Sequence, residues 1–328
     1  MNDTIPSLDF LIYQTLIKHS DETHLLSMSD LRSICDLQGH PCDRRTVYKA
    51  IDALKALGIQ IHFVRKNGKQ GYYIEHLFTN AEAMFLMNAV ATSPILSKEE
   101  TMKIIAKINT LLAKEEINQI PSLYINENKT IDSHILNDAQ VLFPAIAHKY
   151  YVDFKYFDIT VSKKKKYRKQ DNFYHLVPYA IVFSNSKYYV VFYSSKHQNF
   201  ANFRLDKMDK IVVTNEISQE VHFSLQDHMR NSFEMFHGQG QTITAIFKHS
   251  LAQNVFDQFG QNIIISKVEE DTFTASIRTT ITPPLVSWLI QYMDAITVLQ
   301  PQELINQLQK IGHTLVLNYG KEENHDSN

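Results

Sequence analysis

Residues 43–57 read DRRTVYKAIDALKAL, and the rest of the chain is best interpreted outward from this stretch. Its apolar residues recur at helical spacing and form one stripe: Val47, Ala50, Ile51, Leu54 and Leu57. Asp43 precedes the stripe, where an aspartate can cap a helix by accepting hydrogen bonds from backbone N–H groups. Gly58 follows it, where a glycine can end the helix. The pattern predicts one amphipathic helix.

The opposite face of this predicted helix is basic and aromatic. Its first two turns carry Arg44, Arg45, Thr46, Tyr48 and Lys49. A short helix with such a face suits DNA recognition, because its first turn can lie in the major groove. The alternative is an ordinary amphipathic helix with a solvated basic face, and the helix alone does not decide between the two.

The flanking segments favour DNA recognition. Upstream, Ser29 can cap a helix that contains Leu31, Ile34 and Cys35, and Gly39 can end it. A short turn at residues 39–41 then leads into the basic helix, and an earlier apolar helix from Leu8 can brace the pair. This succession is a helix-turn-helix pattern.

The segment downstream predicts a β-hairpin, the wing of a winged helix. Apolar residues alternate with polar ones at 59–63, Asn67-Gly68 suits the turn, and the second strand is GYYI at 71–74. Residues 44–72 contain seven Lys or Arg against one acid, Asp52, whereas the whole chain has a formal net charge of -2. The positive charge is therefore local, as expected for contact with phosphates. We expect Lys66 and Lys69 of the hairpin to touch the DNA backbone.

The segment RTVYKAI at residues 45–51, followed by Leu54 and Gly58-Ile59, resembles the recognition helix of bacterial winged-helix regulators that carry a WYL domain. The resemblance implies double-stranded DNA as a partner. We also expect a homodimer, because one recognition helix reads few base pairs and paired helices gain affinity on paired half-sites.

Composition and length bound the class of protein. The chain has 328 residues, enough for two or three domains, with 44% hydrophobic and 21% charged residues, as in globular proteins. No apolar run is long enough to span a membrane, and the start lacks a secretory signal. Two cysteines, Cys35 and Cys42, suit a reduced, cytoplasmic protein. Cys42 directly precedes the predicted basic helix, and one interpretation of this thiol is a redox switch. The alternative interpretation is that Cys42 is only a small residue in a tight turn.

Residues 79–134 are expected to form a helical linker. Helical periodicity covers residues 79–113 with a break at Ser93-Pro94, and residues 117–134 are expected to be a loop. A further helix at residues 135–148 is expected to break or begin near Pro144.

From Tyr151 the pattern changes to short strands with close turns, which predicts a small β-barrel. The four lysines at residues 163–166 are interpreted as a solvated hairpin tip. Pro178, the triplet YYV at 188–190 and the segment FRLDKM at 203–208 resemble a WYL domain. The chain departs from the family's Trp-Tyr-Leu triplet and has Lys207 where an arginine is usual, and His175 lies where many members carry a basic residue.

The resemblance implies an Sm/SH3-like barrel that binds a ligand and controls the attached DNA reader. Arginine suits anions and aromatic faces suit bases, so we expect an anionic, nucleotide or single-stranded nucleic-acid effector. The candidate ligand residues are Tyr156, His175, Tyr189, Arg204 and Lys207. In the alternative interpretation, Tyr189 belongs to the barrel core and Arg204 pairs with Asp206 or another acid.

The C-terminal part is expected to alternate β-α-β-β-α-β, a ferredoxin-like layer that resembles the WCX extension of WYL proteins. Before it, the sequence HGQGQ at 237–241 lacks the features of a phosphate-binding loop and is interpreted as a hinge. The predicted fold is an α+β multidomain chain. Its parts are a winged helix-turn-helix (1–78), the linker (79–134), the WYL barrel (135–218), a connector (219–241), the WCX domain (242–320) and a disordered tail (321–328).

The function expected from the sequence is a ligand-responsive, sequence-specific transcription regulator. The alternative is a nucleic-acid-processing enzyme or RNA-binding factor that uses the winged helix and the barrel as grips. We found no Gly-x-Ser-x-Gly, His-Glu-x-x-His or Cys-x-x-Cys motif, so we expect no catalytic residue, metal site or cofactor. Sequence leaves open the operator, the ligand, the direction of regulation and the dimer interface.

Overall fold

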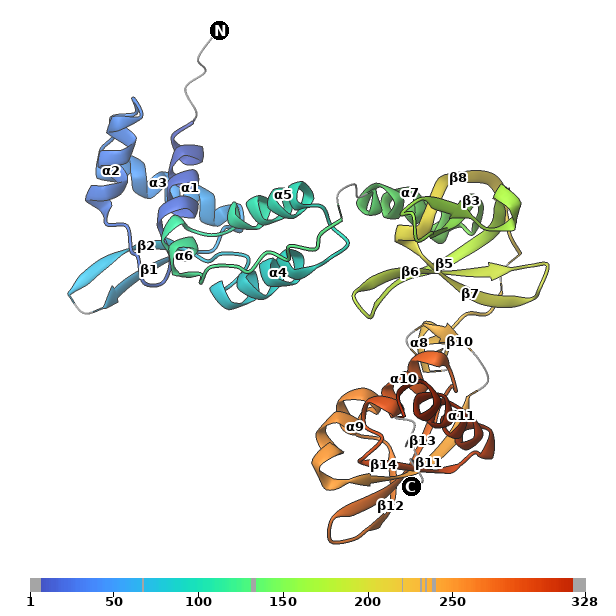
Figure 1. Cartoon of the computed structure of the whole chain (residues 1–328). Coiled ribbons are helices and arrows are strands. Elements are labelled where there is room, and N and C mark those ends of the chain that lie inside the picture. The colour runs from blue at the N-terminus through green and yellow to red at the C-terminus, as the bar shows by residue number, and fades with distance from the viewer. Residues whose placement is uncertain are drawn as a thin grey trace, which may run out of the picture. The chain divides into compact units, whose positions relative to one another are not determined.

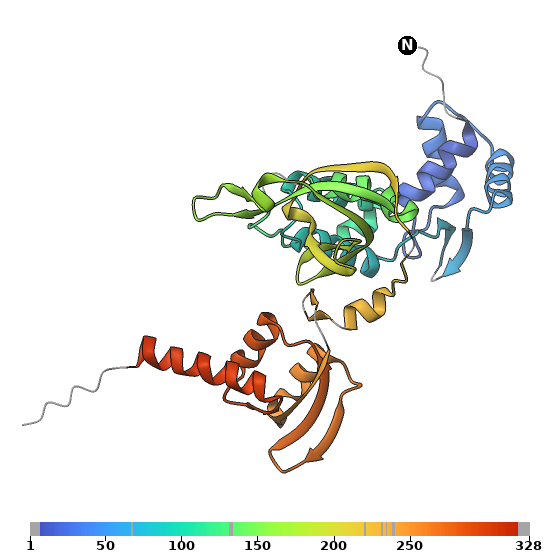
Figure 2. The same cartoon turned by 90° about the vertical axis from the view of Figure 1, so that its right-hand side faces the viewer.

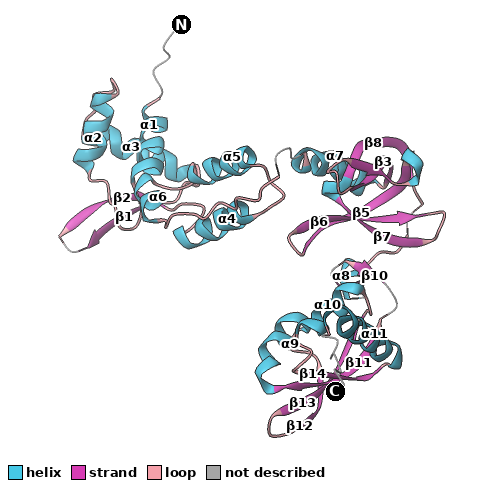
Figure 3. Ribbon diagram, in the orientation of Figure 1, coloured by secondary structure: helices cyan, strands magenta, loops and turns pink. Residues whose placement is uncertain are grey.

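The computed structural model describes residues 7–66, 68–130, 134–219, 221–230, 232–233, 235–237 and 240–320. The chain divides into two compact units, residues 1–133 and 134–328 (Figure 1). The first unit is mostly helical and the second is rich in strands (Figure 3). Among the helices of these described ranges, none is long and apolar enough to cross a membrane. The predicted boundaries between smaller domains stay predictions.

The N-terminal unit begins with three helices that share one core. They are α1 (Leu8–His19), α2 (Met28–Leu37) and α3 (Arg44–Ala56). The core side chains come from one face of each helix and from the following hairpin: Leu11, Ile12, Leu16, Leu31, Cys35, Val47, Ala50, Ile51, Leu54, Ile61, Tyr72 and Ile74. The apolar stripe predicted for residues 47–54 is thus the buried face of α3.

The predicted cap of α2 was wrong by two residues. Ser27, not Ser29, is the N-cap: its hydroxyl accepts from the backbone N–H of Asp30 at 3.2 Å, and the Asp30 carboxylate accepts from the backbone N–H of Ser27 at 2.8 Å. This reciprocal arrangement satisfies two N–H groups at once. Three residues after Ser29 the chain has Arg32, whose side chain cannot accept a hydrogen bond from the backbone N–H of Ser29.

The hairpin predicted after α3 is formed by β1 (Ile61–Lys66) and β2 (Lys69–Ile74), which pair antiparallel. The backbone of Leu26 adds to the outer edge of β2 by two hydrogen bonds with Tyr72, at 2.9 and 2.8 Å. At Gly71 a Cβ atom would lie only 2.6 Å from the carbonyl oxygen of Leu26, so this position requires glycine. Asn67 of the predicted turn lies outside the described residues.

Three more helices complete this unit: α4 (Asn80–Thr92), α5 (Lys98–Asn109) and α6 (Lys114–Gln119). They bury a second core of Ala83, Met87, Ala91, Ile105 and Leu112. The loop predicted at residues 117–134 begins three residues later, because α6 extends to Gln119, and residues 120–130 contain no helix or strand. The Glu116 carboxylate accepts from the backbone N–H of Ala113 at 2.8 Å and so supports the first turn of this short helix.

His76 joins the two cores of the N-terminal unit. Its ring nitrogens lie 2.9 Å from the carbonyl oxygen of Ser20, at the end of α1, and 3.2 Å from that of Leu111, after α5. The Glu116 carboxylate lies 3.8 Å away, and the His76 side chain is only 6% exposed. With the hydrogen on Nε2 the imidazole donates to the carbonyl of the fully buried Ser20, and with the hydrogen on Nδ1 it donates to the carbonyl of Leu111.

We predict that His76→Ala destabilises the N-terminal unit by about 1–3 kcal/mol, because buried carbonyls lose a donor and a cavity remains. His62→Ala is the matched control, since the His62 side chain is 41% exposed in the hairpin and should change stability far less. Urea unfolding of both variants measures the difference. Equal unfolding free energies would contradict the structural role of His76.

The C-terminal unit begins with α7 (Ile135–His148), which packs on the sheet that follows. The prediction of a break near Pro144 was wrong, because the helix continues through this residue. Proline removes one backbone hydrogen bond from a helix interior. Leu142 and Ala145, both fully buried, flank the proline, and their packing against the sheet compensates for that loss.

Six strands form a curled sheet after α7. They are β3 (Tyr150–Ile159), β4 (Lys165–Tyr167), β5 (Tyr174–Ser184), β6 (Lys187–Ser194), β7 (Asn199–Arg204) and β8 (Met208–Ile217). The order is β4-β3-β5-β6-β7, and β8 pairs with β3. Two of the four lysines predicted as a hairpin tip, Lys165 and Lys166, belong to β4 instead. Short 3-10 turns occupy Lys169–Asp171 and Leu205–Lys207.

The predicted connector contains regular structure: α8 (Leu225–Arg230), β9 (Ser232–Phe233) and β10 (Phe236–His237). The Phe223 ring lies 4.8 Å from that of Phe200 on β7, and His228 bonds the Asn202 side chain at 2.8 Å. This part of the connector therefore packs on the curled sheet. Gly238 and Gln239 of the predicted hinge lie outside the described residues.

The last segment forms a four-stranded antiparallel sheet with helices (Figure 2). Its elements are β11 (Gln241–Lys248), α9 (Ala252–Phe259), β12 (Ile264–Val268), β13 (Thr272–Thr279), α10 (Pro283–Gln291), β14 (Ile296–Gln300) and α11 (Gln302–Tyr319). The strand order is β12-β13-β11-β14. The helix predicted from Ser250 begins with a 3-10 turn at His249–Leu251 before α9.

Candidate functional site

The first turn of α3 is held by Asp43 in the predicted way. The Asp43 carboxylate accepts from the backbone N–H of Thr46 at 2.8 Å and from its hydroxyl at 2.7 Å. These hydrogen bonds lower the pKa of Asp43. The Thr46 hydroxyl is thereby committed to the cap, whereas the side chains of Arg44 and Arg45 are exposed.

Tyr48 links α3 to the hairpin. Its ring is 48% exposed, and its hydroxyl interacts with that of Tyr72 on β2. Burial, together with this neighbour, raises the pKa of Tyr72 to about 12. Tyr48 therefore connects α3 to the hairpin, and Lys49 next to it is also exposed.

The hairpin extends this cationic surface. Arg65 on β1 donates through Nε to the Gln70 side chain at 2.7 Å, which orients its guanidinium along the strand pair. Lys66 and Lys69 are paired in register at the end of the hairpin. Lys69 is exposed, and the Lys66 side chain lies outside what the structure describes. The predicted DNA-binding residues Arg44, Arg45, Tyr48 and Lys49 of α3 are thus exposed, and so is Lys69 of the hairpin.

A second group of predicted residues meets around Tyr156 on β3. The Tyr156 hydroxyl accepts from the backbone N–H of Arg204 at 3.2 Å, and its burial raises the pKa of this tyrosine. The Arg168 guanidinium lies over the ring, 5.1 Å from the centroid, as in a cation–π contact. The Phe203 ring packs edge-on at 5.1 Å.

The cations of this group are paired with acids of the same sheet. Arg204 donates twice to the Asp206 carboxylate, at 3.0 and 2.7 Å, which is the pairing left open in the sequence analysis. Arg168 donates twice to Asp158, at 2.7 and 3.1 Å, and Lys207 donates to the same carboxylate at 2.9 Å. Hydrogen bonds from Arg168 and Lys207 hold the pKa of Asp158 far below its usual range.

The sequence analysis missed three members of this cluster: Arg168, Lys169 and Tyr174. The Lys169 ammonium lies 3.7 Å from the centroid of the Tyr174 ring. Partial burial and the nearby Lys196 lower the pKa of Lys169. No carboxylate partner of Lys169 or Lys196 occurs within the described parts of the chain, so this edge of the cluster is positively charged. The available signal was that Arg168 and Lys169 follow the lysine run at residues 163–166 after a single residue, Tyr167.

Two predicted ligand residues lie differently from the rest. Tyr189 is half-buried rather than in the core, and it stands opposite Arg204 in the β6–β7 register. His175 follows Tyr174 in β5, so its side chain points to the other face of the sheet. There its ring stacks on Tyr151 at 4.4 Å and bonds Asp153 at 2.7 Å. The structure therefore does not bring His175 to the Tyr156 cluster.

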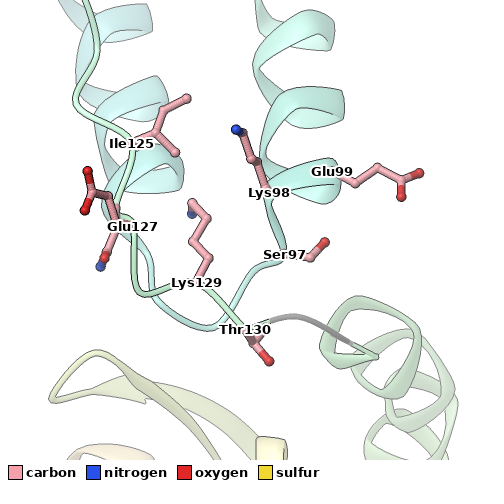
Figure 4. Close-up of a pocket in the computed structure, with 8 residues that line it drawn as sticks. Ser97, Lys98, Glu99, Ile125, Glu127, Lys129 and Thr130 are labelled. Atoms are coloured by element: carbon pink, nitrogen blue, oxygen red, sulfur yellow. The ribbon is translucent and has the colours of Figure 1, made fainter.

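The N-terminal unit also contains a hollow of about 680 Å³, lined by residues 97–99, 125–127 and 129–130 (Figure 4). Lys129 reaches across it and donates to the carbonyl oxygens of Ser93 at 2.8 Å and Val90 at 3.3 Å. Burial lowers the pKa of Lys129. This lysine caps the end of α4, which gives it a structural role. Across the described ranges, no three His, Cys, Asp or Glu side chains gather closely enough to hold a metal ion.

Residues 139–213 match the family model of the WYL domain. The chain contains a WYL domain. The matched segment runs from α7 into β8 and thus covers the curled sheet and the Tyr156 cluster, which confirms the resemblance seen in the sequence.

Several solved structures match this chain at low identity and low TM-score. Proteasome accessory factor B/C (PafBC) of Arthrobacter aurescens is 16% identical at a TM-score of 0.30, and the match covers 98% of this chain. The chain spans about half of that protein, 51% of its length. A CRISPR Cas-related protein is 12% identical at a TM-score of 0.23, with 96% of this chain and 78% of the other covered. A comparison with curated proteins finds no match.

We predict that Asp158→Asn lowers the stability of the C-terminal unit by at most about 1 kcal/mol at neutral pH, because its ion pairs are partly solvated. The folded pKa is depressed, so the carboxylate stabilises the fold above the usual aspartate pKa of about 4 and loses this effect as the pH falls below it. The difference in unfolding free energy between wild type and variant should therefore shrink in acid. Urea titrations over a pH series measure it, and a difference that grows in acid would contradict the pairing.

Proposed function

We propose that this protein is a sequence-specific DNA-binding transcription regulator in which the WYL domain senses an anionic ligand. The observation that carries the proposal is the basic face of α3, which packing forces outward beside a hairpin with further cations. Such a concentration of positive charge on an exposed helix is the electrostatic footprint of a DNA reader. The WYL domain supports assignment to a family of regulators.

In this proposal α2, the turn and α3 form a helix-turn-helix, and the β1–β2 hairpin is its wing. The first turn of α3 enters the major groove, where Arg44 and Arg45 can donate to guanine. Lys66 and Lys69 contact phosphates. The β-α-β-β-α-β succession and antiparallel sheet after residue 240 support a ferredoxin-like WCX domain.

We further propose that the regulator binds DNA as a homodimer. One α3 helix contacts few base pairs, and two-fold related helices reading two half-sites gain both affinity and specificity. Light scattering of the protein alone and on operator DNA tests this point, since a monomer in both states would refute it. A regulator of this kind works in the cytoplasm and needs no catalytic group, so we propose no enzymatic step.

We predict that Arg44→Ala and Arg45→Ala each weaken operator binding by roughly 1–3 kcal/mol and relax sequence preference, because each removes a base-reading donor. Lys69→Ala should weaken binding to all sequences alike and flatten its salt dependence. Lys107→Ala, on the exposed side of α5, is the control. Gel-shift titration after operator footprinting measures these effects. Unchanged affinity of the double arginine variant would refute the assignment.

The ligand site of this proposal is the cluster around Tyr156. Arg204 and Lys207 supply positive charge, and the half-buried Tyr174 and Tyr189 supply aromatic rings on which a base can stack. The buried Tyr156 holds the Arg204 backbone through its hydroxyl. Lys169 and Lys196 add charge that no described carboxylate balances. These properties suit a nucleotide or single-stranded nucleic acid, which combines phosphates with flat bases. His175 faces away and has no part in this site.

We predict that Arg204→Ala folds and binds DNA but loses the response to the inducing condition. The variant removes the guanidinium that an anionic ligand needs, whereas Arg204→Lys should keep part of the response. A coupling of about 1–3 kcal/mol corresponds to a several-fold to hundredfold change in DNA affinity. A reporter assay with and without the inducing condition measures it. A full response in a well-expressed Arg204→Ala variant would place the sensor elsewhere.

A further inference from the structure

Both cysteines of the chain lie at the turn between α2 and α3. Cys35 is in the last turn of α2 and is 1% exposed. Cys42 directly precedes the Asp43 cap of α3 and is partly buried against the same core. Two thiols that are seven residues apart in sequence thus lie against one core, between the two helices of the predicted DNA reader.

Both side chains pack in the same apolar core beside this turn. Burial, followed by the neighbouring Cys42, raises the pKa of the Cys35 thiol to about 12. Cys35 therefore stays protonated at neutral pH and is a poor first nucleophile. Cys42 is the more accessible sulfur, and it directly precedes the first turn of α3. Arg32 donates through Nε to the Cys42 carbonyl at 3.0 Å.

We propose that Cys35 and Cys42 are a redox modification site that closes to an intramolecular disulfide when the protein meets a hydroperoxide. The Cys42 thiolate attacks one peroxide oxygen, the O–O bond breaks, and the products are a Cys42 sulfenic acid and an alcohol or water. The Cys35 sulfur then attacks the sulfenic sulfur and releases its proton, and the hydroxyl group leaves as water. In sum, two thiols and one hydroperoxide give a disulfide, an alcohol and water.

Formation of the disulfide changes the conformation of the turn between α2 and α3. A disulfide holds its sulfur atoms at about 2.05 Å, much closer than two unbonded thiols can approach. The Cys42 carbonyl is bound by Arg32, and the next residue caps α3, so a shift of Cys42 is passed to the first turn of that helix. A consequence for DNA affinity rests on the proposed function, because that turn carries Arg44 and Arg45.

The test uses the full-length protein treated with hydrogen peroxide, then a maleimide that labels free thiols, and peptide mass spectrometry. We expect both thiols to disappear together, a cross-linked peptide containing Cys35 and Cys42, and full recovery after dithiothreitol. In Cys35→Ala we expect Cys42 to stop at a sulfenic acid that a 1,3-diketone reagent traps. In Cys42→Ser we expect Cys35 to remain unmodified, with circular dichroism confirming that both variants are folded.

Three results would overturn the inference: thiols that persist in peroxide, a disulfide between two chains, or wild-type Cys42 oxidised while Cys35 stays free. A gel shift with reduced and oxidised protein separates this inference from the proposed function. We expect oxidation to change operator affinity several-fold, and the Cys35→Ala variant to lose this reversible change. If neither form binds DNA, the proposed function fails, while the cross-linked peptide still decides the disulfide.

Discussion

The burial of one stripe on α3 is the constraint on which the N-terminal unit depends. Val47, Ala50, Ile51 and Leu54 are between 0% and 5% exposed, and they contact side chains from α1, α2 and β1. A helix that buries this stripe has no freedom to turn about its axis, because rotation would carry charged groups into the core at a cost of several kcal/mol. The outward direction of the arginines of α3 is therefore a result of packing.

In the WYL domain the equivalent constraint is electrostatic. Aromatic side chains from β3, β5 and β7 fill the inner face, and the cations at its edge need acceptors once they are partly withdrawn from water. Asp158 serves two of them and Asp206 serves one. Asp158 and Asp206 thus hold this cluster in shape, and the anionic ligand proposed above has to compete with them.

The sequence predicted the features that depend on neighbouring residues. Periodicity located α3 and the hairpin, and the Asp43 cap was correct, because each follows from residues within a turn or a strand pair. Pairings between residues far apart in the chain could not be predicted from the sequence. Arg168 pairs with Asp158 because of the register of β3 with β4. His175 points away from the Tyr156 cluster because successive side chains of β5 point to opposite faces of the sheet. The cap of α2 was missed although the Ser27–Asp30 box is readable in the sequence, because a second serine lay nearby.

For the ligand site proposed above, the pairing within the WYL domain restricts which ligands can act as a switch. An anion that only replaces Asp206 on Arg204 exchanges one bidentate pair for another and gains little, so it shifts no equilibrium between two states of the protein. Lys169 and Lys196 repel each other and have no described carboxylate partner, so an anion that also reaches them relieves that repulsion. A ligand with several phosphates, or a strand whose bases stack on Tyr174, therefore has a larger differential affinity than a small monoanion.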